Sequence, residues 1–525
     1  MGSSPNNRVI SMVKQFSLEE FEGELVATME EAVETRPLPE TPFCVALLGD
    51  WSGRANRGLS ASTAELAGWR PLLIDRDNLD QLIEKLGPKL HLPVGADGEM
   101  SVTISFRDLD DFHPDRIFDR LDLFDKLGHL RARLQSPGSF GEAAAEVRSW
   151  ADIEVGPAQP EPDLPTAEIN PGDGGLLDQI LDQSATNAPR PAPKVSSEIS
   201  ALAREAVAPY LVPGPDAQEA ELVAAVDQEI GRQMAAILHH PDFQALEAAW
   251  RAANLLVSRL RTGAELKIYL LDVSRAEFEA DLMSVDDISQ TALYKLLVER
   301  SVGTAGGVPW ALVAANYQFD QTTTDVEVLS RMSKIARAGR TPFVAEASAR
   351  FVGCDSIAIS PEPEDWLIEE SEARSAWNKL KQQSTARYIG LTLPRFLLRL
   401  PYGKDTEPVE TFDFEEQPPD EAPQHNWYLW GNAAFLTAYL LGEAFTRSGW
   451  DFLPGEVQEI EGLPLHIYKL DGETETKPCA ESLMTLRAAE RIIEEGLMPL
   501  ISMKDTDIVR LGMFQSIART LFGVR

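Results

Sequence analysis

The sequence predicts an α/β protein with mixed sheets flanked by helices, built as two halves that are joined by a Pro/Gly-rich linker. Two observations lead to this prediction. Apolar runs of strand length alternate with amphipathic helical stripes on both sides of a proline-dense stretch. In the second half, a strand, a capped helix and another strand follow one another, which makes a parallel βαβ unit. The expected boundaries are 1–150, a linker at 151–195, and 196–525.

The first half shows strand and helix signals in alternation. Val102–Phe106 alternates apolar and polar residues, as a half-buried strand does. Asp77 is placed to cap a helix that stops at Gly87-Pro88, and Pro114 is suited to open a longer helix. The expected elements are strands at Phe43–Leu48, Arg70–Asp75 and Val102–Phe106, and helices over Leu79–Leu86 and from Pro114 to Leu130. Val9–Val13 is a weak candidate for an N-terminal strand.

The second half carries the stronger periodic signals. Asp242 precedes a helical stripe that reaches Leu260. Thr324 and Glu327 predict a capping box, and Gly339 lies where a left-handed C-terminal cap would fall. The expected strands are Leu266–Leu270, Pro309–Ala315 and Pro342–Ala347. Trp427, Trp430 and Trp450 are interpreted as packing anchors, and Pro394, Pro401 and Gly403 as residues that set bends.

The linker contains one short amphipathic segment between two proline clusters. Its apolar residues recur at helical spacing and form one narrow stripe: Leu176, Leu177, Ile180 and Leu181. A helix inside a linker has no core of its own to cover that stripe, which makes it a candidate docking peptide. A helix that folds back on a neighbouring domain explains the stripe equally well.

Composition excludes several classes of function. Lys and Arg number 48 against 83 Asp and Glu, and this charge of −35 repels nucleic acid and anionic lipid. The cysteines Cys44, Cys354 and Cys479 are odd in number and widely spaced, which fits a reducing cytosol. Neither a signal region nor a membrane-span pattern is visible, so we expect cytoplasmic residence and no membrane insertion.

We find no catalytic motif, and predict that the chain is not an enzyme and needs neither cofactor nor metal. Tyr402-Gly403-Lys404 partly matches a phosphate-binding loop, but the first glycine of that motif is Leu398 here. The acidic residues Asp108, Asp110, Asp111 and Asp115 surround His113 and could in principle hold a divalent ion. Because Asp111 or His113 before Pro114 also suits a helix start, we favour capping over metal binding.

Two regions nevertheless resemble the two subunits of one machine. The segment from about Phe43 to Leu134 resembles TssB (VipA), the small sheath subunit of the type VI secretion system. The resemblance rests on Leu47–Gly53, Ile74–Asn78 and Phe106–Phe112, followed by His113-Pro114-Asp115. The motif residues expected to matter structurally are Gly49, Asp50, Asp75, Asp77, Phe106 and Arg107.

The segment from about Leu176 to Ser516 resembles TssC (VipB), the large sheath subunit. Several blocks of residues occur in the family's order, beginning with Asp242–Glu247 and Tyr317–Asp320 and ending with Leu429–Ala433. The motif residues in this half are Phe243, Trp250, Gly390, Pro394, Arg395, Phe396, Pro401, Tyr402, Gly403, Trp430, Gly431 and Asn432.

The resemblance implies a sheath-like fold and a mechanical function. In this family, small and large subunits pair, polymerise around an inner tube and contract to propel it. The implied partners are sheath subunits, the inner tube protein, the baseplate and an AAA+ disaggregase, which grips a helix at the position of Leu176–Leu181. Family members continue well beyond the region of Leu497–Ser502, whereas this chain ends at Arg525. The alternative is therefore a non-polymerising accessory protein that caps, nucleates or links the sheath to the baseplate.

Overall fold

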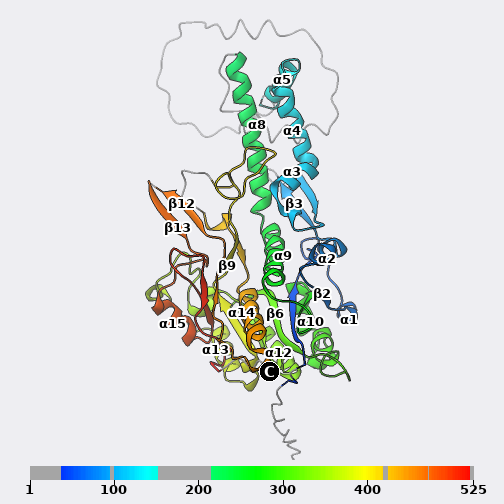
Figure 1. Cartoon of the computed structure of the whole chain (residues 1–525), viewed down its shortest axis with the longest axis vertical. Coiled ribbons are helices and arrows are strands. Elements are labelled where there is room, and N and C mark those ends of the chain that lie inside the picture. The colour runs from blue at the N-terminus through cyan, green and yellow to red at the C-terminus, as the bar shows by residue number, and fades with distance from the viewer. Residues whose placement is uncertain are drawn as a thin grey trace, which may run out of the picture.

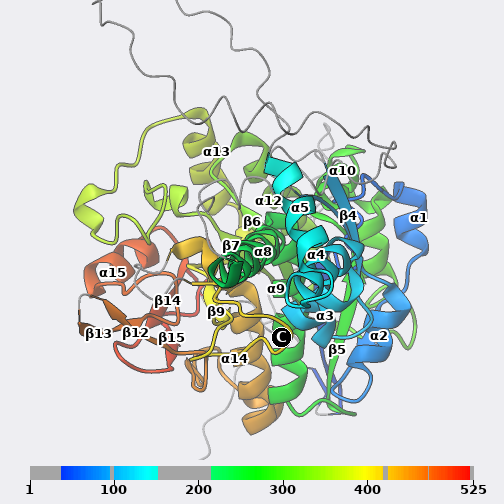
Figure 2. The same ribbon diagram turned by 90° about the horizontal axis from the view of Figure 1, so that it is seen from above.

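The structure is a computed structural model of the 525-residue chain, and it describes residues 37–38, 40–94, 100–151, 215–417, 424–470 and 472–520. The described residues before 152 are called the N-terminal part below, and those from 215 onward the C-terminal part. Figure 1 shows a wide α/β body, with the helices α4, α5 and α8 rising from one end of it. Seen from above in Figure 2, α8 and α4 stand side by side, and Arg131 of α4 pairs with Asp227 of α8 at 2.5 Å.

The strands and helices alternate along both parts of the chain. The strands are β1 Phe43–Gly49, β2 Leu72–Ile74, β3 Lys89–Val94, β4 Met100–Ser105, β5 Leu266–Asp272, β6 Trp310–Phe319, β7 Phe343–Ala347, β8 Ile389–Leu393, β9 Phe396–Arg399, β10 Leu429–Gly431, β11 Glu459–Ile460, β12 His466–Leu470, β13 Glu473–Lys477, β14 Met498–Ser502 and β15 Val509–Leu511. The α-helices are α1 Thr63–Gly68, α2 Leu79–Leu86, α3 Pro114–Arg120, α4 Asp122–Leu134, α5 Phe140–Ala151, α8 Pro215–Leu238, α9 Pro241–Arg259, α10 Arg275–Met283, α11 Ala292–Tyr294, α12 Thr323–Gly339, α13 Glu372–Lys381, α14 Ala433–Ser448 and α15 Leu486–Glu494.

Within the described residues, one nine-stranded sheet organises the body, and both parts of the chain contribute to it. Its order is β11-β15-β14-β8-β7-β6-β1-β5-β2. The strands from β14 to β5 run parallel to their neighbours, and antiparallel strands lie at both edges. β1 and β2 belong to the N-terminal part, so a strand of that part lies inside the sheet between two strands of the C-terminal part.

The sequence of β1 explains this central position. All seven of its residues are buried, as expected for a parallel strand that is covered on both faces. Because successive side chains point to opposite faces, Phe43, Val45 and Leu47 enter one core together with α9 and α14. Cys44, Ala46 and Leu48 enter a second core on the other face. β1 therefore joins the two layers of the protein as well as its two parts.

The parallel βαβ unit expected from the sequence is confirmed, because β6, α12 and β7 form it with β6 and β7 parallel. Its caps differ from the expectation. Thr322, not Thr324, accepts the N–H of Asp325 at 3.1 Å, while Glu327 pairs with Arg331 one turn later. The helix includes Gly339, and the left-handed conformation falls on Arg340, with φ of 50°.

Two expectations in the N-terminal part were also wrong in detail. Asn78, not Asp77, is the N-cap of α2, because Asp75 accepts the N–H groups of Asp77 and Asn78 at 3.0 Å and closes the turn first. The long helix from Pro114 is two helices that meet at the extended residue Leu121. This break accompanies the stacking of Phe118 on Phe124, at 5.5 Å between ring centroids.

Two predicted elements fall outside the described residues. These are the candidate strand Val9–Val13 and the linker helix with Leu176, Leu177, Ile180 and Leu181. None of the described helices combines the length and apolar character that a bilayer crossing requires.

The place of β1 between β5 and β6 leads to a prediction about the linker. A specific protease site inserted at Gly174 and then cut should leave the two parts associated in size-exclusion chromatography, because separation must break two parallel ladders. Val45→Asp, in the buried centre of β1, should abolish that association. The matched control Leu73→Asp, at a 44% exposed residue of the edge strand β2, should preserve it. Separate elution of the cut wild-type parts would contradict the shared sheet.

Candidate functional site: the interface of the two parts

The turn that follows β1 is bound by several groups of the C-terminal part. The backbone N–H groups of Trp51 and Ser52 donate to one carboxylate oxygen of Asp272 at 2.8 and 3.2 Å. Trp250 of α9 donates its indole N–H to the Trp51 carbonyl at 3.0 Å, and the two rings meet edge to face at 5.2 Å. Both indoles are fully buried, so they anchor the turn and exclude water from it.

Two motif residues beside this turn have clear structural roles. Asp50 accepts the N–H groups of Arg54 and Ala55, at 2.8 Å each, and so closes the turn. Gly49 ends β1 against β6, where an added Cβ would lie 3.2 Å from the Cβ of Asn316. A larger side chain there would crowd Asn316 of β6.

An aromatic cluster forms a second contact between the parts. Phe106 stacks on Phe112 with ring centroids 4.0 Å apart, and Phe243 of α9 meets both rings edge-on at 5.9 and 5.8 Å. All three side chains are buried. The backbone N–H of Arg107 donates to Asp111 at 2.8 Å, which fixes the loop that presents Phe106. The structure therefore brings together Phe106 and Phe243, which the sequence singled out in separate halves.

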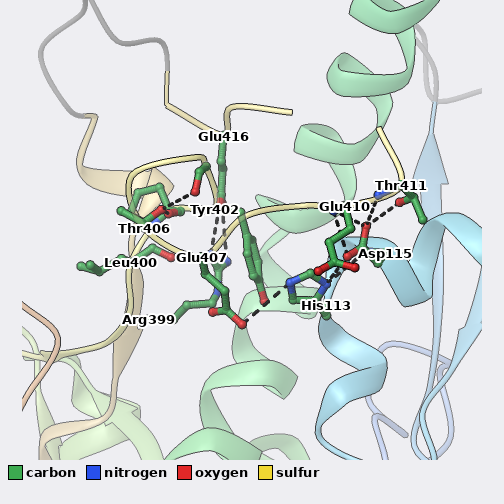
Figure 3. Close-up of polar contacts among 12 residues, drawn as sticks. His113, Asp115, Arg399, Leu400, Tyr402, Thr406, Glu407, Glu410, Thr411 and Glu416 are labelled. Atoms are coloured by element: carbon green, nitrogen blue, oxygen red, sulfur yellow. Dashed lines mark hydrogen bonds and ion pairs between the residues drawn. The ribbon is translucent and has the colours of Figure 1, made fainter. Parts of the chain in front are cut away.

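The third contact is made by a segment here called the strap, residues 400–417, which follows β9. Figure 3 shows that the strap extends from the rest of the C-terminal part to α3 of the N-terminal part. The backbone N–H groups of Glu410 and Thr411 and the Thr411 hydroxyl donate to the Asp115 carboxylate at 2.5–3.2 Å. Phe412 stacks on Phe118 with centroids 4.9 Å apart. The strap thus binds the beginning of α3 through backbone amides and an aromatic pair.

A buried charge network holds the base of the strap (Figure 3). Arg399 lies between Glu247 and Glu416, with N···O distances of 3.0 and 2.8 Å. These three side chains are 2%, 0% and 0% exposed. Glu416 also accepts the backbone N–H of Tyr402 at 2.7 Å, and its other oxygen contacts His239 at 3.0 Å.

Tyr402 completes this network. The Arg399 guanidinium lies over its ring at 4.2 Å, and Arg251 donates to its hydroxyl at 3.0 Å. Burial raises the pKa of Tyr402 well above its ordinary value, so the phenol stays neutral. Burial alone would also raise the pKa of Glu416, but Arg399 and His239 outweigh it and lower that pKa below its ordinary value. The network therefore holds an ionised carboxylate in the interior.

The two remaining motif residues of this region shape the strap. Pro401 accepts a hydrogen bond from the Thr406 hydroxyl at 2.5 Å. At Gly403, an added Cβ would lie 2.2 Å from a carboxylate oxygen of Glu415, so a larger residue there would displace that exposed side chain. The chain there turns back on itself and does not form a phosphate-binding loop.

The sequence predicted that Asp111 or His113 begins a helix, and the structure confirms this for His113. His113 is the N-cap of α3 and its ring nitrogen accepts the N–H of Asp115 at 3.2 Å. Asp111 pairs with Arg120. In the part of the chain that the structure describes, no group of three or more His, Cys, Asp or Glu side chains is arranged to hold a metal ion.

The next motif residues of the C-terminal part lie in β8 or directly after it. Gly390 pairs with Val344 in the ladder of β8 and β7. Pro394 follows β8 through a cis peptide bond, and Phe396 is buried in β9. Arg395 contacts Glu481 at 2.6 Å. Arg395 and Glu481 line a second polar region, whose lining includes no residue of the strap.

The beginning of α14 lies next to that second region. Trp430 donates to the His425 carbonyl at 2.8 Å. Gly431 leaves room for Leu398, whose nearest carbon would lie 2.7 Å from an added Cβ. Asn432 is the N-cap of α14 and accepts the N–H of Ala434 at 2.9 Å. Trp430, Gly431 and Asn432 thus connect the short sheet of β9 and β10 to the helix that covers the main sheet.

Comparison with known families agrees with this arrangement. Residues 220–518 match the family model VipB, described as EvpB/VC_A0108, tail sheath N-terminal domain. The chain belongs to the VipB tail sheath family. Residues 27–139 match a second model, T6SS_VipA, described as Type VI secretion system, VipA, VC_A0107 or Hcp2. The chain is therefore a fusion of a VipA-like part and a VipB part, as its two resemblances predicted.

A curated relative gives the same assignment for the longer part. The type VI secretion system sheath protein TssC1 of Pseudomonas aeruginosa is 33% identical over 349 residues. The match covers 65% of this chain and 70% of the relative.

Sequence reasoning missed the buried charges of the VipB part. Arg399 lies in the run Phe396-Leu397-Leu398-Arg399-Leu400, and a cation in such an apolar run is unusual enough to indicate a buried ion pair. Its partners Glu247 and Glu416 lie 152 and 17 residues away, and no local pattern connects them. The contact of Asp115 with the strap was equally hidden, because the two segments are almost 300 residues apart in sequence.

Removal of Arg399 tests the charge network. Arg399→Met should lower the free energy of unfolding by about 3 kcal/mol, because it leaves the buried Glu247 with Arg251 and the buried Glu416 with His239 as their remaining cationic partners. Urea unfolding followed by tryptophan fluorescence measures this change. In the control Arg447→Met, which removes a 59% exposed arginine that pairs with Glu443, we expect a loss below about 0.5 kcal/mol. Equal losses in the two variants would show that the network does not stabilise the fold.

The carboxylate of Glu346 predicts a dependence of stability on pH. Burial raises its pKa from 4.5 to about 7, with Arg395 lowering it and Glu481 raising it. The folded state therefore binds a proton at Glu346 more tightly than the unfolded state does. The contribution of this protonation to the stability of the fold is complete below pH 4.5 and is lost as the pH rises through 7.

Glu346→Gln should remove that dependence. The unfolding free energy of the variant minus that of wild type should increase by about 2–3 kcal/mol from about pH 5 to about pH 8. Urea unfolding at the two pH values gives the difference. Glu473→Gln, at an exposed residue of β13, is the matched control and should show no such gain. A gain that does not change with pH would contradict the raised pKa of Glu346.

Proposed function

We propose that this chain is a building unit of a type VI secretion sheath, in which one polypeptide takes the place of a paired small and large subunit. Membership of the VipB family and the VipA-like part make it a component of that sheath. In this proposal the fused units polymerise around an inner tube, and the assembled sheath contracts to propel it.

The observation that carries the proposal is the position of β1. Its ladders with β5 and β6 place the VipA-like part inside the main sheet of the VipB part. Two surfaces that merely touched could act separately, whereas a shared sheet makes the pair one mechanical body. Force applied to either part would pass through backbone hydrogen bonds and two shared cores.

The charge network supports a structural role over a catalytic one. Arg399 and Glu416 are each bound by several protein groups, and both are buried. A catalytic group must instead reach a substrate. The network therefore fits a role in holding the strap against the body, and we propose that the protein is not an enzyme.

The proposed partners follow from the same function. Neighbouring sheath subunits, an inner tube and a baseplate would contact the outer faces of this body. An AAA+ disaggregase would bind the linker stripe of Leu176, Leu177, Ile180 and Leu181, which lies outside the described residues. All of these contacts would be made in the cytoplasm.

Negative-stain electron microscopy of the purified chain tests the proposal. We expect hollow tubes, since every copy would carry both parts of the building unit. Chain cut in the linker should form the same tubes, because β1 still holds the parts together. Uniform single particles, with the 57.9 kDa mass of one chain in mass photometry, would overturn polymerisation and favour a protein that caps, nucleates or joins the sheath to the baseplate.

A further inference from the structure

A polar cavity of about 330 Å³ lies outside the carboxyl ends of three adjacent parallel strands, β6, β7 and β8. Gln318 comes from the end of β6, Glu346 from the end of β7, and Arg395 from just after β8. In open α/β sheets, small ligands bind at this edge, because the strand ends and following loops converge there. Neither the β1 contact nor the strap accounts for this cavity.

Glu346 is the unusual group in the cavity wall. It is only 3% exposed, yet no arginine, lysine or histidine forms an ion pair with it among the residues that the structure describes. Its carboxylate accepts one hydrogen bond from the Gln318 amide at 2.7 Å and a longer one from the Ala433 N–H at 3.4 Å. Ala433 begins the 16-residue helix α14. Neutral donors alone compensate weakly for the loss of water around a carboxylate.

The cations near Glu346 are engaged by other carboxylates. Arg395 makes contacts of 2.6 and 2.9 Å with Glu481, and His425 contacts the same carboxylate at 3.0 Å. Together they outweigh the effect of burial and lower the pKa of Glu481 to about 2. Glu481 therefore stays ionised, holds Arg395 in place and compensates its positive charge.

The second arginine of the wall is engaged in the same way. Arg350 pairs with Asp320 at 2.8 Å and with Asp355 at 3.4 Å. Four carboxyl groups and two guanidinium groups thus line this wall. Above about pH 7, where Glu346 is ionised, the wall carries an excess of negative charge. A cavity with this balance attracts a cation and repels an anion.

We propose that this cavity binds a small organic cation with a primary ammonium or guanidinium group, and that Glu346 is its counter-ion. An organic cation fits better than a metal ion, because no cluster of metal-ligating side chains occurs in the described residues. The N–H groups of such a cation match the acceptors of Glu346 and Asp320. The same chemistry is available from a free amine or from a basic side chain of a partner protein.

Isothermal titration calorimetry on the full chain tests this site. Agmatine is the free probe, N-acetyl-arginine-N-methylamide represents a protein side chain, and glutarate is the anionic control. The titrations belong in about 0.15 M salt, where loose attraction to the acidic surface is largely screened. We expect one agmatine per chain and no binding of glutarate. If N-acetyl-arginine-N-methylamide (the blocked arginine) binds and agmatine does not, the natural ligand is an arginine side chain of a partner protein.

Two matched variants decide whether the cavity is the site at which the cation binds. Glu346→Gln should weaken binding by about tenfold or more, because it removes the counter-ion and keeps the shape of the side chain. This variant is expected to fold at least as stably as wild type, so weaker binding cannot be ascribed to unfolding. Glu473→Gln removes an equal charge from an exposed position on β13 and should change affinity less than about twofold.

Two results would overturn the proposal. One is the absence of saturable binding for both agmatine and the blocked arginine. The other is equal weakening by Glu346→Gln and Glu473→Gln, which would mean that binding depends on the general surface charge. Neither result bears on tube formation, so this site and the sheath function stand or fall separately.

Discussion

The pairing of β1 with strands on both sides is the constraint on which the rest of the structure depends. A parallel strand inside a sheet must satisfy its backbone groups on both edges and cover both of its faces. β1 finds its partners in β5 and β6, and its side chains enter two separate cores. Neither part of the chain alone provides that environment. The VipA-like and VipB parts therefore form one folded body, and Trp51 with Trp250 extends the contact beyond the sheet.

The interface also depends on polar groups that an apolar sheet cannot supply. The strap passes from the Arg399 network at its base to Asp115 of the VipA-like part. Apolar packing is tolerant of small shifts, whereas a buried ion network with several hydrogen bonds is satisfied in one arrangement only. The network thus fixes the position of the strap, and the strap in turn fixes α3. In a body that transmits force, this restriction opposes sliding of one part over the other.

The sequence predicted the elements well where the signal is local. β1, β5 and β7 coincide with apolar runs, and the parallel βαβ unit followed from a strand, a helix and a strand in order. Caps were less predictable, because Thr322 and Thr324 are equally suited chemically and only the backbone decides between them. The long-range contacts were out of reach. The VipB-type motif Phe243–Trp250 marked the right helix, but nothing local indicates that Trp250 reaches Trp51 or that Glu247 reaches Arg399.

The same geometry explains how the fusion is compatible with the fold. Figure 1 shows α5 and the beginning of α8 at the same end of the molecule, and the two helices contact each other. The chain therefore leaves the VipA-like part and enters the VipB part at neighbouring points. A tether between neighbouring points makes pairing intramolecular, at an effective concentration on the order of millimolar, without changing the contacts themselves. Since β1 contributes to both cores, the tether mainly ensures that each VipB part folds around its own β1.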